Sequence, residues 1–191
     1  MLSIHYHLSF WLALPAAGGV AALFGIALGL PTMRLRDIYL AITTMGFGEI
    51  IRLVLLNWSD LTRGSMGLPG IPAPAFFGMS MDNGYFYYYL ALALAGVTIL
   101  AMDRIVDSRL GRALIAIRED EVAAKSMGIP TTRYKITAFT VGAFFAGIAG
   151  SFYAHYTSFI DPQSFSFGEF TIILALVVLG VFKLGVLWYG W

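Results

Sequence analysis

The sequence lacks cysteine and contains few charged residues. With no Cys in 191 residues, disulfides and cysteine-based metal or redox sites are excluded within them. Only 12% of the residues are charged and 59% are hydrophobic, whereas a soluble domain usually carries about 25% charged residues. Most side chains must therefore face lipid or other helices, which predicts an integral membrane protein. The net charge of +1 gives no reason to expect a nucleic-acid partner.

Motifs for catalysis and for nucleotide binding are also missing. The sequence has no Walker A motif, so it cannot hydrolyse ATP by that route, and no His-Glu-x-x-His or Gly-x-Ser-x-Gly motif. His5 and His7 are close to the start, and His155 lies between Tyr153 and Tyr156, which favours a place in an interfacial aromatic belt over a ligand or base. We therefore expect no catalytic residue, no metal ligand and no cofactor.

Long apolar runs predict an all-α, polytopic bundle of about five transmembrane helices in a single domain, 1–191. A span needs roughly 20 apolar residues. The runs that meet this length are 10–30, 38–57, 85–102, 136–157 and 170–191.

The distribution of Lys and Arg predicts the orientation of the spans. Loop 103–135 and loop 31–37 are basic, whereas loop 58–84 holds only Arg63 and loop 158–169 holds neither Lys nor Arg. Because basic loops stay in the cytoplasm, the N-terminus is predicted outside and the C-terminus inside. Basic residues are densest in loop 103–135, which contains Arg104, Arg109, Arg112, Arg118, Lys125, Arg133 and Lys135.

Small residues recur at every fourth position in two of the spans. Such ridges let helix backbones approach closely in lipid, so they favour tight packing in the bundle over the lining of a substrate path. Span 136–157 has two ridges, and span 10–30 has one. Their members are Gly142, Ala146, Gly150 and Ala154; Ala143, Gly147 and Ser151; and Ala13, Ala17, Ala21, Gly25 and Gly29.

Span 38–57 carries two opposite charges, Glu49 and Arg52. Each central charge costs roughly 2.5–3.5 kcal/mol on insertion, and each large apolar residue returns about 0.3–0.6 kcal/mol, so this span is marginal alone and must face protein or water. The i,i+3 spacing lets the two side chains pair. One interpretation is a self-satisfied ion pair at a helix interface. The other is a translocation path that also includes Thr43, Thr44, Gly46 and Gly48.

Residues 107–128 of the basic loop predict an amphipathic helix. Asp107 or Ser108 can cap its start, and Gly128 followed by Pro130 ends it. The helix would dock onto a soluble partner or lie on lipid headgroups. Its apolar stripe consists of Leu110, Leu114, Ile117, Ala124 and Met127.

Several ordered runs resemble the LivM-type permeases of branched-chain amino acid ABC importers. The runs are 33–42, 46–52, 61–68, 111–129, 134–139, 143–147 and 153–156. The resemblance implies a coupling helix in loop 103–135 that inserts into an ATPase subunit. ABC importers mark this helix with Glu-Ala-Ala and, after three further residues, Gly. Ala123, Ala124 and Gly128 match this motif, whereas Val122 holds the Glu position and Glu121 comes one residue early.

The resemblance also implies partners and a location. Coupling residues would be Arg118, Glu121, Ala123, Ala124 and Gly128. Partners would be a second permease subunit, cytoplasmic ATPase subunits and an extracellular or periplasmic solute-binding protein docking on loops 58–84 and 158–169. The chain would be a multi-pass protein of the bacterial plasma (inner) membrane.

Two departures from the family and two other function classes remain. Family members are longer, and after residue 180 they continue with a Gly-rich stretch where this chain has an apolar tail containing Lys183. We interpret the chain as a truncated or frame-shifted member, with ordinary divergence as the alternative.

An ion-coupled secondary transporter, with Glu49 carrying a proton, is the next function class. An intramembrane enzyme is less favoured because the catalytic motifs are missing.

Overall fold

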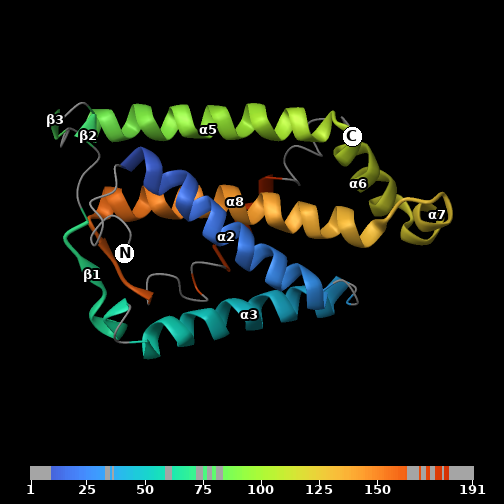
Figure 1. Ribbon diagram of the computed structural model, residues 1–191, viewed down its shortest axis with the longest axis horizontal. Coiled ribbons are helices and arrows are strands. Elements are labelled where there is room, and N and C mark those ends of the chain that lie inside the picture. The colour runs from blue at the N-terminus through green and yellow to red at the C-terminus, as the bar shows by residue number, and fades with distance from the viewer. Residues whose placement is uncertain are drawn as a thin grey trace. The chain divides into compact units, whose positions relative to one another are not determined.

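The computed structural model confirms an all-α fold (Figure 1). It describes residues 10–32, 35, 37–58, 62–71, 75–76, 79–80 and 84–162, together with 168, 171–172, 175–177 and 179–180. The helices are α2 (Phe10–Thr32), α3 (Asp37–Asn57), α5 (Gly84–Val106), α6 (Arg109–Glu119), α7 (Glu121–Ser126) and α8 (Thr131–Thr157). The short elements are η1 (Gly64–Met66), β1 (Leu68–Pro69), β2 (Ala75–Phe76), β3 (Met79–Ser80) and β4 (Phe159–Ile160).

Four of the five predicted spans coincide with long helices. α5 and α8 extend beyond the apolar runs that predicted them, because helical hydrogen bonding continues into polar turns. Among the described residues, α2, α5 and α8 are long and apolar enough to cross a membrane. Most of the fifth predicted span lies outside the described residues, so the count of five stays a prediction.

The chain divides into two compact units. The first contains residues 1–44 and 70–158, and the second contains residues 45–69 and 159–191. Among the described residues, the first unit holds α2, α5, α6, α7 and α8. The second holds most of α3 and the antiparallel pair β1–β4, in which Leu68 lies opposite Ile160. In the first unit the N–H groups of Gly70 and Ile71 also donate to Ser158 O, at 3.2 and 3.4 Å.

The first unit is built on the contact between α2 and α8, which cross in Figure 1. The small residues of α2 meet those of one α8 ridge at backbone distance. A methyl group added to Gly147 would lie 2.6 Å from Ala21 Cβ and 2.7 Å from Ala17 O. One added to Gly25 would lie 2.7 Å from Ala143 Cβ. Backbones this close require residues without larger side chains, as the sequence predicted.

Of the two small-residue ridges predicted in α8, the structure uses one against α2. The ridge that contains Ala143 and Gly147 forms the contact. In the other ridge, a methyl group on Gly142 or Gly150 would meet nothing within 4 Å. Sequence periodicity could not distinguish the two, because both have the same spacing.

α2 and α5 run in one direction and α8 runs in the opposite direction, as the predicted topology requires. Gly29, near the end of α2, lies beside Ile136, near the start of α8. At the other end, Phe10 of α2 and Tyr87 of α5 both contact His155 of α8. The C-terminal end of α2 and the α6–α7 segment therefore lie at the same end of the unit.

His155 is buried among aromatic side chains near the end of α8, and its place at a membrane interface stays a prediction. Its side chain is 4% exposed and lies edge-on to the Phe10 ring, with the ring centroids 5.0 Å apart. Nδ1 lies 2.7 Å from Ser151 O, and Tyr87 donates to the His155 carbonyl at 3.3 Å. The Ser151 carbonyl can only accept a hydrogen bond. Its contact with Nδ1 therefore assigns the ring proton to Nδ1. Nε2 is buried without a partner among the described residues.

A sharp corner joins α5 to α6. Ser108 accepts hydrogen bonds from the N–H groups of Leu110 and Gly111, which confirms the predicted cap. A methyl group added to Gly111 would lie 2.0 Å from Val106 O and 2.6 Å from Val106 Cα. The corner therefore requires glycine at this position.

Alanine substitutions of two glycines of α8 should change stability in opposite directions. Gly147→Ala places a methyl group against Ala21, so we expect destabilisation of about 1–3 kcal/mol from overpacking. Gly150→Ala points into open space, so we expect up to about 1 kcal/mol of stabilisation from helix propensity. The measurement is the midpoint of thermal unfolding in detergent. Equal shifts for the two variants would show that α2 does not pack on the Gly147 ridge.

Gly111→Ala should destabilise the α5–α6 corner, because its methyl group overlaps Val106 O. We expect a lower unfolding midpoint and faster proteolysis of the α6–α7 segment. The matched control is Gly96→Ala in α5, where an added methyl group meets nothing within 4 Å. A wild-type midpoint and cleavage rate for Gly111→Ala would contradict the geometry of the corner.

Candidate functional site

The loop predicted to carry one amphipathic helix carries two. α6 ends at Glu119, and Asp120 caps α7: its Oδ1 accepts from Val122 N at 2.8 Å and Ala123 N at 3.0 Å. A carboxylate that binds the N–H groups of the following turn starts a new helix rather than continuing the old one. The single-helix prediction was therefore wrong in this detail. Its end was right: Gly128 has φ +81° after α7.

Side chains of α6 and α7 divide into an inner and an outer face. Ala113, Ile117 and Ala124 are buried. Ala113 was not in the predicted stripe, whereas Ile117 and Ala124 were. Met127 was in the stripe, but it is 83% exposed, and Val122 is 65% exposed. The exposed side of the α7 segment therefore carries these two large apolar side chains beside the polar Lys125 and Ser126.

The five predicted coupling residues do not share one environment. Arg118, Ala123 and Gly128 are exposed, whereas Ala124 is only 5% exposed. Ala124 therefore anchors α7 to its own chain. Val122 and Met127, which were not among the predicted coupling residues, offer the large apolar side chains on the accessible face. We call the exposed residues Arg118, Val122, Ala123 and Met127 the α7 surface.

Glu121 forms an ion pair within the chain. Its Oε1 lies 2.7 Å from Lys135 Nζ on α8, and both side chains are partly exposed. The sequence assigned Glu121 to the coupling motif and did not single out Lys135 as its partner. No helical spacing relates the two residues, because the chain turns between α7 and α8.

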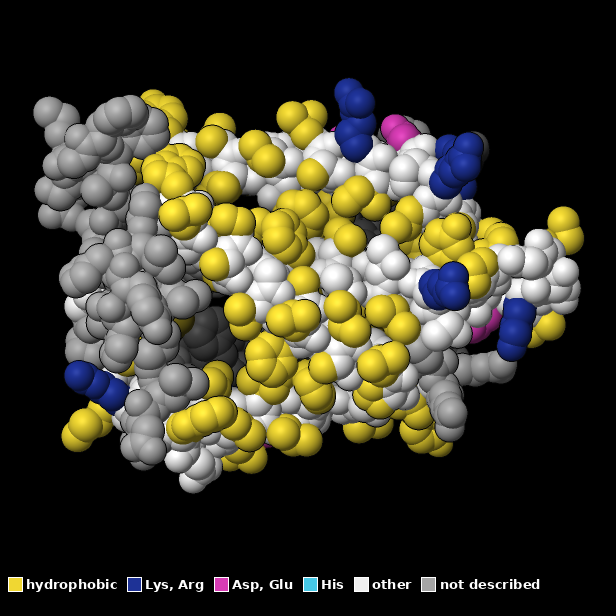
Figure 2. All heavy atoms as spheres, viewed as in Figure 1, with side chains coloured by type: hydrophobic (Ala, Val, Ile, Leu, Met, Phe, Trp, Pro, Cys, Tyr) yellow, Lys and Arg dark blue, Asp and Glu magenta, His cyan; other side chains and the backbone are white. Residues whose placement is uncertain are grey.

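Charge and hydrophobicity are separated on the face drawn in Figure 2. Yellow hydrophobic side chains cover the helices, and the dark blue Lys and Arg side chains lie mainly toward the end that carries α6 and α7. This distribution is the one expected of a bundle whose basic end projects from the membrane.

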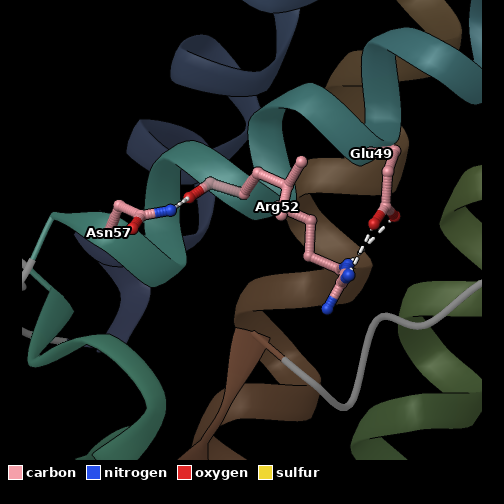
Figure 3. A network of polar contacts seen from close by, with 4 residues as sticks. Glu49, Arg52 and Asn57 are labelled. Carbon is pink, nitrogen blue, oxygen red and sulfur yellow. Dashed lines mark hydrogen bonds and ion pairs between the residues drawn. The ribbon is translucent and has the colours of Figure 1, made fainter.

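α3 carries the second candidate site, in the second unit (Figure 3). Arg52 Nε donates to Glu49 Oε2 at 2.9 Å, and Arg52 Nη2 donates to Glu49 Oε1 at 2.5 Å. This two-bond geometry confirms the pairing that the i,i+3 spacing predicted. Asn57 is one turn further on and donates instead to Leu53 O at 2.8 Å.

The other predicted path residues of α3 are two threonines and two glycines. The Thr44 hydroxyl donates to Leu40 O at 2.7 Å, which satisfies it within the helix. Thr43 is partly exposed. Gly46 and Gly48 are exposed, with nothing within 4 Å of an added methyl group. Arg52 lies four residues after Gly48 and three after Glu49, so it is beside both of them on the surface of α3.

Metal binding finds no support in the part of the chain that the structure describes. Its His, Asp and Glu residues form no group of three or more that could hold a metal ion.

The chain is similar to known transport permeases over nearly all of its length. It is 42% identical to the high-affinity branched-chain amino acid transport system permease protein LivM of Salmonella typhimurium, over 94% of this chain and 48% of that protein. It is 31% identical to the autoinducer 2 import system permease protein LsrC of Klebsiella pneumoniae, over 87% of this chain and 46% of that protein. No solved structure shows significant similarity.

The chain spans about half the length of the curated relatives it matches. The model of one protein family, described as the permease component of the branched-chain amino acid transport system, matches residues 1–188. Since this match covers almost the whole sequence, the chain belongs to that family of transport permeases.

Proposed function

We propose that the chain forms part of the transmembrane permease subunit of an ATP-driven importer for branched-chain or related amino acids. Its location would be the bacterial plasma membrane, with the basic end of the bundle in the cytoplasm and the N-terminus outside. The observation that carries this proposal is the α7 surface: a short capped helix at the basic end that exposes Val122 and Met127. Family membership supports the transport class.

The α7 surface suits docking onto a soluble ATPase. Its centre is apolar, with Val122 and Met127, and Arg118 supplies a positive charge beside it. Apolar centres with a polar rim are typical of protein interfaces. Lipid headgroups are the other occupant that the sequence left open, and the docking experiment below separates the two.

Further partners would be a second permease subunit and an external solute-binding protein. Residues from the two loops predicted to receive the binding protein lie together, because Leu68 pairs with Ile160. Gly67 permits this pairing: it has φ +68°, and an added methyl group would lie 2.7 Å from Ile160 O. The β1–β4 pair would present backbone from both loops to the binding protein.

The candidate translocation path would follow the α3 face of Gly48, Glu49 and Arg52. Charges in a span are costly and face protein or water rather than lipid. The same ion pair argues against the ion-coupled carrier, because Glu49 would have to release Arg52 each time it took up a proton. Uptake that survives ATP depletion but collapses with the proton gradient would favour the carrier.

Docking can be tested by charging the α7 surface. Val122→Asp and Met127→Asp should each reduce the co-purified ATPase about tenfold or more, as expected for loss of an anchor worth about 2 kcal/mol. The matched control is Ile115→Asp, which changes another exposed apolar side chain, on α6. The two test variants and the Ile115→Asp control should all insert normally into the membrane. Full ATPase recovery with Val122→Asp and Met127→Asp would reject the docking role.

The path can be tested by removing both charges of α3 together. The double variant Glu49→Leu/Arg52→Leu should insert more readily, because two costly charges are gone. Amino-acid uptake by the importer should nevertheless fall about tenfold or more. Asn57→Leu is the control, since it changes a polar side chain of the same helix outside this face. Wild-type uptake by the double variant would mean that the pair only satisfies itself.

A further inference from the structure

The ion pair between Glu121 and Lys135 joins α7 to α8. Glu121 is the first residue of α7, and Lys135 lies in the second turn of α8. With Nζ and Oε1 only 2.7 Å apart, the two side chains connect the helices directly. The ion pair also fixes the N-terminal turn of α7, which begins directly after the break at Asp120.

α7 needs such connections, because six residues are too few to form a stable helix alone. At its far end, Ile129 N donates to Ala124 O at 3.1 Å, and Gly128 turns the chain into α8. Ala124 is buried within the first unit. At its near end, the cap from Asp120 orders the first turn but makes no bond to α8. The ion pair supplies that bond.

We propose that Glu121 and Lys135 are positioning residues that make α7 and the start of α8 move as one body. The inference rests on the proposed function, because α7 is then the element that the ATPase displaces. Movement of α7 would pass through the ion pair into α8. It would continue into α2 through the close contact of Gly147 with Ala17 and Ala21. Glu121 thus acts within the chain rather than on the ATPase.

A distance measurement tests the connection without the ATPase. The 191 residues contain no Cys, so spin labels on Val122→Cys and Thr132→Cys add unique probes to this region. In nanodiscs, the full permease should give one narrow distance between the labels. Glu121→Lys or Lys135→Glu should broaden it, and the exchange Glu121→Lys/Lys135→Glu should narrow it again. An unchanged distribution in the single variants would overturn the proposal.

Coupling provides the second readout, measured in proteoliposomes with the unlabelled complex. The single variants should keep their co-purified ATPase but transport several-fold less amino acid per ATP hydrolysed. The charge exchange should restore the ratio, which a loss of folding or of docking would not allow. Wild-type ratios in the single variants, or no recovery in the exchange, would reject a positioning role.

The two readouts separate this inference from the proposed function. If the wild-type chain fails to recruit an ATPase, the proposed function fails, whereas the label distances still decide whether the ion pair positions α7. If recruitment is normal and the distances do not respond to the charges, only the positioning role fails.

Discussion

The close approach of α2 and α8 is the contact on which the rest of the first unit depends. Two apolar helices in lipid gain little by burying surface, so packing must come from van der Waals contact at short range. Gly25 and Gly147 permit that range because their backbones meet Ala143 and Ala17 directly. α8 then carries α7 at one end and His155, with its contacts to α2 and α5, at the other.

Charged residues are accommodated in two different ways. On α3, Glu49 and Arg52 neutralise each other by a two-bond pair on the same helix, so a costly insertion becomes tolerable. At the basic end, Glu121 pairs with Lys135 across a turn of the chain, and the pair orders a short helix. An exposed pair of this kind contributes little to global stability, so its value lies in fixing where α7 is. Because the chain belongs to a family of transport permeases, both ion pairs are features of a transport permease.

Local interactions were the part of the candidate site that the sequence predicted well. The Ser108 cap and the Glu49–Arg52 pair each involve residues within one helical turn, so spacing alone identifies them. The same reasoning failed at Asp120, because a carboxylate can cap a new helix or remain within an existing one. The periodicity of the sequence does not distinguish these two cases. The exposure of Met127 was missed because α7 ends at Ser126 and Met127 is its C-cap, so the stripe assumed for one continuous helix does not extend that far.

The sequence by itself determined the membrane class, the position of the long helices and the need for close helix packing, since these follow from hydrophobic length and from small residues at regular spacing. Only the tertiary structure decided which ridge of α8 meets α2, that His155 is enclosed by Phe10 and Tyr87, and that Glu121 faces Lys135. Each of these depends on how separate helices come together, and the periodicity of a single helix carries no information about its neighbours.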